Sequence, residues 1–375
     1  MRLSRRFLYL VVDTHSFSSS PRYTLHRIDP SHLFYTNGAA NRAALAAAAV
    51  DTPLPEPTMS FSSSEDMQFT LLGRRMDKIL GMDCKGRGIL YEDDTHAVRP
   101  MPGMTAPERY RPLSVAVDGV GPEGEGSLYV IEAEPTRDLP SQPQSVEALV
   151  YEGRHSCNQK DDWVWRSLPP PPYVHELPGL GTDERSGEII CHGMEGNRVV
   201  NGSLVWVSTA GRGTYWLDTG SGMWSKASDW ALPFRGRASP VWEYGLWFGF
   251  SAVDSGHICA TNLYLAAEDG RPPVAEQVWE GFAVPEGCRE MGSYLMYLGN
   301  FRFCVAKLFR MTTRRQGGGC CWDVPKEECF ATLTGVEVVR GDHACKWHQM
   351  MKHRSLQYLG EYFSGCVLWC LFARH

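Results

Sequence analysis

Short apolar runs bounded by Gly, Pro, Asn and Asp recur from one end of the chain to the other, whereas helical periodicity is nearly absent. This pattern predicts a mostly β protein. The first predicted strand pair is Arg6–Asp13 and Tyr23–Ile28, joined by a serine-rich loop. The segment 37–57 is the exception, because its alanine run predicts either a short helix or a surface loop.

From residue 60 onward one unit recurs along the sequence. Each copy has a strand that carries a tyrosine and ends in acidic residues, then a variable loop, then a strand with Trp or Val that closes on proline. The marker tyrosines are Tyr91, Tyr151, Tyr215 and Tyr264, so successive copies lie 60, 64 and 49 residues apart. Two further short strands precede each marker, which gives four strands per unit. A four-stranded antiparallel sheet that repeats radially is the β-propeller arrangement, whose blades span roughly 40–50 residues.

The last copy and the remainder of the chain supply the final predicted strands. We expect a single all-β propeller domain over residues 1–375, with six blades and with the two chain ends sharing one blade. These last predicted strands are Leu246–Phe250, His257–Thr261, Leu263–Asp269, Val278–Pro285, Tyr294–Leu298, Arg302–Phe309, Cys329–Leu333, Val336–Val339, Gln357–Phe363 and Cys366–Phe372.

Composition and charge narrow the class of protein. The 375 residues carry 43 acidic and 37 basic side chains, a net charge of −6, which lacks the basic footprint of a nucleic-acid binder. No apolar run approaches the roughly 18 residues of a membrane helix, and Phe7–Val12 is too short for a signal peptide. The 12 cysteines are scattered, which favours a reducing compartment. We expect an intracellular monomer, cytoplasmic or nuclear, with neither nucleic-acid nor membrane partners.

The opening segments Arg5–Asp13 and Tyr23–Asp29 resemble the start of a large cereal-plant family known only as a domain of unknown function (number 1668). That family is similar in pattern to kelch propellers and to F-box-associated domains, and the resemblance covers nearly the whole chain. It implies a kelch-like propeller related to the substrate receptors of ubiquitin ligases. The chain departs from the kelch pattern in lacking a regular Gly-Gly doublet. No helical F-box is expected, because residues 1–13 predict a strand.

Two motifs suggest a cofactor or a metal, and both have a simpler interpretation. Gly119–Gly124 matches the dinucleotide-binding fingerprint, but it leads into a strand and not a helix, so it predicts a hairpin loop and no cofactor. A group of Cys and His residues lacks the paired spacing of zinc ligands, so we interpret it as scattered thiols and expect no metal site. Its members are Cys320, Cys321, Cys329, His343, Cys345 and His348.

Enzymatic motifs are missing from the sequence. It contains no Gly-x-Ser-x-Gly elbow, no His-Glu-x-x-His and no phosphate-binding loop. The acidic clusters Glu92–Asp94, Asp161–Asp162 and Glu268–Asp269 lie at strand ends, where acidic residues are common turn formers. We therefore expect no catalytic residues. The alternative is a propeller hydrolase or lyase that uses two carboxylates in the central channel.

A Trp-rich stretch from Phe234 to Trp247 is the candidate for partner binding. We expect it to be a connection between repeats, where propeller loops form a binding face. Arg, Trp and Tyr are enriched at binding hot spots, so the expected contact residues are Arg235, Arg237, Trp242 and Tyr244. The alternative is that Trp242 and Trp247 pack between blades. The tetraproline at 169–172 predicts a stiff linker. The predicted function is a non-catalytic β-propeller that binds a protein partner of unknown identity.

Overall fold

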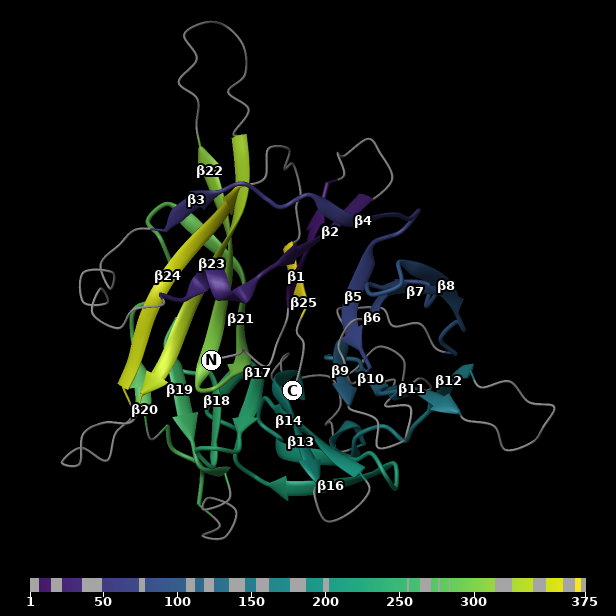
Figure 1. The fold of residues 1–375 in the computed structure, drawn as a ribbon. Coiled ribbons are helices and arrows are strands. Elements are labelled where there is room, and N and C mark those ends of the chain that lie inside the picture. The colour runs from purple at the N-terminus through teal and green to yellow at the C-terminus, as the bar shows by residue number, and fades with distance from the viewer. Residues whose placement is uncertain are drawn as a thin grey trace, which may run out of the picture. The chain divides into compact units, whose positions relative to one another are not determined.

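The computed structural model divides the chain into two compact units, one of residues 1–66 and 279–375 and the other of residues 67–278. Figure 1 labels most of their strands. The described residues are 7–14, 22–35, 49–73, 78–105, 112–117, 125–134, 146–152, 162–175, 187–197, 202–254, 256–263, 271–275, 277–282, 284–313, 326–339, 349–359 and 368–371. Within these ranges no helix is long and apolar enough to span a membrane.

The unit of residues 67–278 contains successive antiparallel sets of four strands, in chain order (Figure 1). The first set is β5 (Met67–Leu72), β6 (Lys78–Asp83), β7 (Gly88–Glu92) and β8 (Ala97–Met101). The second is β9 (Leu113–Val117), β10 (Ser127–Ile131), β11 (Val146–Glu152) and β12 (Asp162–Ser167). The third is β13 (Ile189–Asn197), β14 (Gly202–Thr209), β15 (Gly213–Asp218) and β16 (Met223–Ser228). The fourth is β17 (Phe234–Val241), β18 (Leu246–Ser251), β19 (Ile258–Thr261) and β20 (Gln277–Trp279), which ends at the unit boundary.

Apolar side chains hold neighbouring sets of this unit together. Alternate residues of a strand point to the same face, so each set offers an apolar face to the next. Leu80 and Leu90 of the first set pack in one buried cluster with Leu149 and Trp163 of the second. Further clusters join the second set to the third, and the third to the fourth. A short parallel pairing of β13 with β17 also links the third and fourth sets into one sheet.

The other unit contains two sheets. The first comprises the long strands β21 (Cys288–Gly299), β22 (Arg302–Thr313), β23 (Lys326–Val339) and β24 (Gln349–Leu359), with β3 (Val50–Thr52) parallel to β24. The second has the order β25 (Leu368–Leu371), β1 (Leu8–Asp13), β2 (Arg22–Ile28) and β4 (Pro57–Ser62). A short 3-10 helix, η1 (Pro30–Leu33), follows β2. One buried cluster, which includes Leu10, Leu33, Met296 and Leu333, joins these elements.

These sheets confirm the predicted all-β fold class, and the chain is of the β-propeller class built from four-stranded antiparallel sheets. The pairing of β1 with β25 confirms that the two chain ends share a sheet. The blade count and the single domain over 1–375 stay predictions. In the segment 37–57, Val50–Thr52 forms β3 and the alanine run lies outside the described residues.

Two strand predictions were wrong. Cys329–Leu333 and Val336–Val339 belong to one continuous strand, β23, because Gly335 is not a turn residue. A side chain at Gly335 would collide with the backbone oxygen of Leu33, so the glycine lets η1 approach the strand closely. The predicted strand Val278–Pro285 is also wrong in its extent, since β20 ends at Trp279.

Candidate functional site

The stretch from Phe234 to Trp247 is not a connection between repeats, as the sequence suggested, but a β-hairpin of β17 and β18. The prediction failed because the residues of β17 do not alternate between apolar and polar. A bulge between Arg235 and Ser239 breaks the register with β18, and Gly236 there has a φ of 70°. Pro240 lies beyond the three residues that pair with β13, so its missing N–H costs no bond on that side.

The four expected contact residues do not share one surface. Arg235 pairs with Phe250 at one end of the hairpin, whereas Trp242 follows β17 at the other end. From Arg235 onward the partners of β17 on β18 run only from Phe250 to Leu246, so at about 3.3 Å per strand residue these two positions are roughly 15 Å apart. Arg237 lies between them in the bulge. Only Trp242 and Tyr244 are neighbours, in the turn Trp242–Gly245, which we call the Trp242 turn.

Arg237 contacts the neighbouring strand and lies away from the Trp242 turn. The parallel pairing of β13 with β17 sets it beside His192. Burial, and secondarily the positive charge of Arg237, lower the pKa of His192 to about 3. His192 is therefore uncharged at neutral pH, and Arg237 helps to keep it so. The charge of Arg237 thus acts on His192 of the neighbouring strand β13.

The Trp242 turn is fixed by its own backbone. The amide of Tyr244 donates to the carbonyl of Val241 at 3.0 Å, and the amide of Gly245 donates to the carbonyl of Trp242 at 3.1 Å. Gly245 has a φ of 64°, which a glycine adopts without strain. Trp242 is 39% exposed, whereas Trp247 is 1% exposed and belongs to the core between the third and fourth sets. The alternative expectation, that these tryptophans pack between neighbouring blades, therefore holds for Trp247 and not for Trp242.

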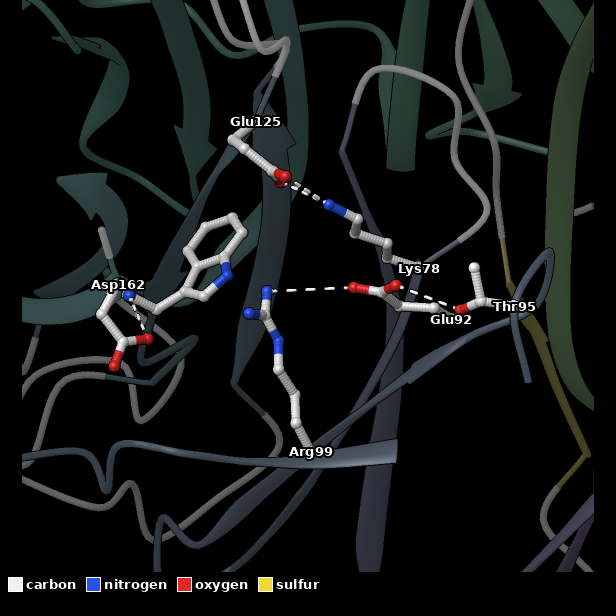
Figure 2. Close-up of polar contacts among 7 residues, drawn as sticks. Lys78, Glu92, Thr95, Arg99, Glu125 and Asp162 are labelled. Atoms are coloured by element: carbon white, nitrogen blue, oxygen red, sulfur yellow. Dashed lines mark hydrogen bonds and ion pairs between the residues drawn. The ribbon is translucent and has the colours of Figure 1, made fainter. Parts of the chain in front are cut away.

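The acidic clusters that could serve a hydrolase are partly described, and their carboxylates have local partners (Figure 2). Glu92 accepts a hydrogen bond from the Thr95 hydroxyl at 3.3 Å and lies 4.0 Å from the guanidinium of Arg99. Asp162 accepts a hydrogen bond from the backbone amide of Trp163 at 2.8 Å. These contacts are those of turn formers. Residues 161, 268 and 269 lie outside the described residues.

Figure 2 also shows an ion pair between the first and second sets. The Lys78 ammonium lies 2.5 and 2.6 Å from the two carboxylate oxygens of Glu125, and both side chains are less than one-fifth exposed. We expect Glu125→Gln to lower the free energy of unfolding by about 1 kcal/mol, because the partly buried ammonium loses a charged acceptor. Urea unfolding measures this change.

The matched control for this prediction is the ion pair of Arg166 with Glu152, which is also 2.5 Å long but more exposed. Glu152→Gln should cost less than about 0.5 kcal/mol, since solvent screens an exposed pair. Equal effects of the two substitutions would show that burial does not strengthen the Lys78 pair.

The structure describes only part of the predicted cofactor and metal motifs. Residues 119–124 lie outside the described residues, but the flanking strands β9 and β10 pair antiparallel, as a hairpin requires. Cys329 is buried in β23 and packs in the core of its unit. The other members of the Cys and His group lie outside the described residues. In the described part of the chain, no group of three His, Cys, Asp or Glu side chains could hold a metal ion.

The tetraproline 169–172 runs from β12 to the short 3-10 helix η2 (Pro172–Val174). The indole N–H of Trp224, on β16, donates to the carbonyl of Pro169 at 2.9 Å. Tyr173 is fully buried and stacks near Tyr215, with ring centroids 5.1 Å apart. These contacts connect the second set to the third, which is the place expected for a linker.

Sequence reasoning missed a cluster around Phe34 and Tyr35, directly after η1. The guanidinium carbon of Arg302 lies 4.7 Å from the centroid of the Phe34 ring, and that of Arg354 lies 4.7 Å from the centroid of the Tyr35 ring. At this distance an arginine cation is attracted to the face of an aromatic ring. No local sequence pattern could reveal the cluster, because its members are separated by more than 200 residues along the chain.

The His353 ring lies beside Phe34 and Tyr35, with ring centroids 5.1 and 6.0 Å apart, and contacts Glu337. The backbone amide of Tyr35 donates to Nδ1 of His353 at 3.4 Å, so the proton of the neutral ring is on Nε2, which donates to Glu337 at 3.1 Å. The hydrogen bond from His353, and then the charge of Arg302, lower the pKa of Glu337. Glu337 is therefore a carboxylate that Arg302 and His353 already share.

The four-stranded antiparallel sheets place the chain in the β-propeller class. The chain belongs to the family described as "Protein of unknown function (DUF1668)", which matches residues 5–358. This confirms the family resemblance of the opening segments; the cereal-plant origin and the kelch-like character stay predictions. No curated protein matches the chain.

Solved structures similar to the chain include apo AztD from Citrobacter koseri, with a TM-score of 0.38 and 11% identity over 97% of this chain and 98% of that one. Another is the β-propeller domain of Cps50 (Swd1) from Myceliophteria thermophila, with a TM-score of 0.29 and 11% identity over 71% of this chain and 92% of that one.

Proposed function

We propose that this protein is a non-catalytic β-propeller that binds another protein, and that the Trp242 turn is part of its binding surface. The observation that carries the proposal is the 39% exposure of Trp242 on a turn fixed by backbone hydrogen bonds. Tryptophan is among the residues most enriched at hot spots, and it offers a large contact area with few rotatable bonds. A turn that is ordered before binding also loses less entropy on binding.

Side chains near the Trp242 turn support a mixed surface of the kind proteins bind. Tyr244 is half-buried against Phe248, with ring centroids 6.0 Å apart. Thr261 pairs with Trp247, close to the turn. The Thr261 hydroxyl donates to the backbone carbonyl of Val274, whose side chain is exposed. Exposed apolar groups beside the exposed Glu243 combine apolar and charged contact area, as transient interfaces do.

The family resemblance suggests what the partner is. A relation to substrate-receptor propellers of ubiquitin ligases would make the partner a protein substrate, with this protein acting as an intracellular monomer. No observation on the described residues favours the hydrolase or lyase alternative, because Glu92 and Asp162 have structural partners.

The test compares Trp242→Ala with Val253→Ala in affinity capture from an extract of the source organism, read by mass spectrometry. Val253 is 88% exposed and lies in the turn after β18, at the opposite end of the hairpin, so it is a matched surface control. We expect Trp242→Ala to lose at least tenfold of the partner captured by the wild type, with the melting temperature unchanged.

Arg235→Ala in the same experiment shows whether the far end of the hairpin takes part. An equal loss with Val253→Ala, or full capture by Trp242→Ala, would remove the Trp242 turn from the binding surface. A lowered melting temperature for Trp242→Ala would show instead that the indole stabilises the fold.

A further inference from the structure

Two tryptophans of β12 pack toward the first set, but their indole N–H groups differ in what they contact. The Trp165 N–H donates to the carbonyl of Pro102, just after β8, at 2.9 Å. The next set repeats this contact between the Trp224 N–H and Pro169. Trp163 is 2% exposed, and in the described part of the chain its buried N–H has no hydrogen-bond partner. A buried donor without an acceptor costs stability, and a bound water or ion is a common reason why a native protein keeps one.

A second donor of this kind lies on the facing strand, β8. The Nε–H group of Arg99 is also buried, and none of the described residues accepts a hydrogen bond from it. The end of the guanidinium lies 4.0 Å from the carboxylate of Glu92, which is beyond hydrogen-bond distance. Glu92 therefore neutralises the positive charge of Arg99 only weakly.

The register of the strands brings the two donors together. Arg99 pairs with Leu90, and directly paired residues point to the same face of a sheet. Leu90 packs with Trp163 in one buried cluster, and Met101, two residues after Arg99, packs against the same cluster. Figure 2 shows Arg99 in the same region as Asp162, the residue before Trp163. Both donors therefore lie between the first and second sets.

The surroundings of these donors favour an anion over a water molecule. A water that accepted from both N–H groups would need acceptors for its own two hydrogens, whereas an anion needs none. The nearby carboxylates have other partners, since Glu125 pairs with Lys78 and Asp162 accepts from a backbone amide. The buried cluster around Trp163 consists of apolar side chains, so an ion that binds there must be small and must lose its hydration water.

We infer that the first and second sets bind one anion of the size of chloride between them. The anion accepts one hydrogen bond from the Trp163 N–H and one from the Nε–H of Arg99, and the charge of Arg99 compensates its own. A larger oxyanion such as sulfate would have to push apart the packed side chains around Trp163. Neither residue belongs to the Trp242 turn, so the inference does not rest on the proposed function.

The test is chlorine NMR of the full-length chain, in which exchange with a bound state broadens the chloride resonance. We expect the wild type to broaden it, bromide to compete, and sulfate at the same ionic strength not to compete. Arg99→Gln and Trp163→Phe should each bind chloride at least tenfold more weakly, because each removes one of the two donors. Replacing gluconate by chloride should raise the melting temperature of the wild type by about 3 °C and leave that of both variants unchanged.

Trp165→Phe is the matched control, because it removes from the same strand an indole N–H that already has an acceptor. It should bind chloride like the wild type and melt lower in both salts. The inference is overturned if the wild type does not broaden the resonance, if sulfate competes as well as bromide, or if either variant binds like the wild type. An equal loss of binding in Trp165→Phe would also overturn it. If Trp163→Phe does not fold, Arg99→Gln decides alone, since the Arg99 side chain is 40% exposed and its loss leaves the core intact.

Discussion

Gly193→Ala is expected to lower the free energy of unfolding by about 3 kcal/mol, near the upper end of the range for overpacked cores. A β-carbon at this position would collide with the ring of Trp247 and would lie 2.8 Å from the backbone oxygen of Ala238. Neither can move away easily. Trp247 is fully buried and packs against Trp206, and Ala238 is held by the pairing of β17 with β13.

Urea unfolding followed by tryptophan fluorescence measures this effect, and Gly103→Ala is the control. A β-carbon at Gly103 would have one neighbour, a backbone oxygen at 3.7 Å, so this substitution should change stability by less than about 0.5 kcal/mol. An unchanged midpoint for Gly193→Ala would mean that β13 and β17 are not packed as closely as described.

The second large effect is a pH dependence set by His192. The folded state holds the pKa of this imidazole at about 3, below its ordinary value of 6.5. Between these pH values the unfolded state binds a proton that the folded state does not. The contribution of His192 to the free energy of unfolding is therefore fully present above pH 6.5. It is lost as the pH falls toward 3, by about 1.4 kcal/mol per pH unit.

Denaturant unfolding from pH 7 to pH 4 should show this slope in the wild type, and His192→Gln should remove that part of it. Arg237→Gln should raise the pKa of His192 only partly toward 6.5, because burial is the larger cause of the shift. An NMR titration of the imidazole measures the pKa directly. A pKa near 6.5 in the folded protein would contradict the prediction.

Much of the fold could be predicted because strand alternation is a local signal. The predicted strands Leu246–Phe250 and His257–Thr261 match β18 (Leu246–Ser251) and β19 (Ile258–Thr261) to within one residue. The failures occurred where glycine and proline have tertiary roles. Gly335 separates two apolar runs in the sequence, yet it lies inside β23, where its missing side chain lets Leu33 approach the strand. Gly236 and Pro240 likewise lie inside β17.

The candidate site was less predictable than the fold. Residue type pointed to Trp242 and Arg235, but the register of the hairpin, which separates them, depends on a bulge that no local pattern marks. Trp242 and Trp247 are five residues apart and have similar sequence surroundings. Their exposures differ because one lies in the turn and the other faces the third set.

The pairing of β1 with β25 also bears on synthesis of the chain. The first strand ends at Asp13, and the strand that covers one of its edges begins at Leu368. A ribosome that adds roughly 5–20 residues per second must work for about 20–70 seconds between the two. During that interval the edge of β1 that later pairs with β25 has no partner strand. An unpaired strand edge can pair with other chains, so we expect the nascent chain to bind a chaperone before it leaves the ribosome.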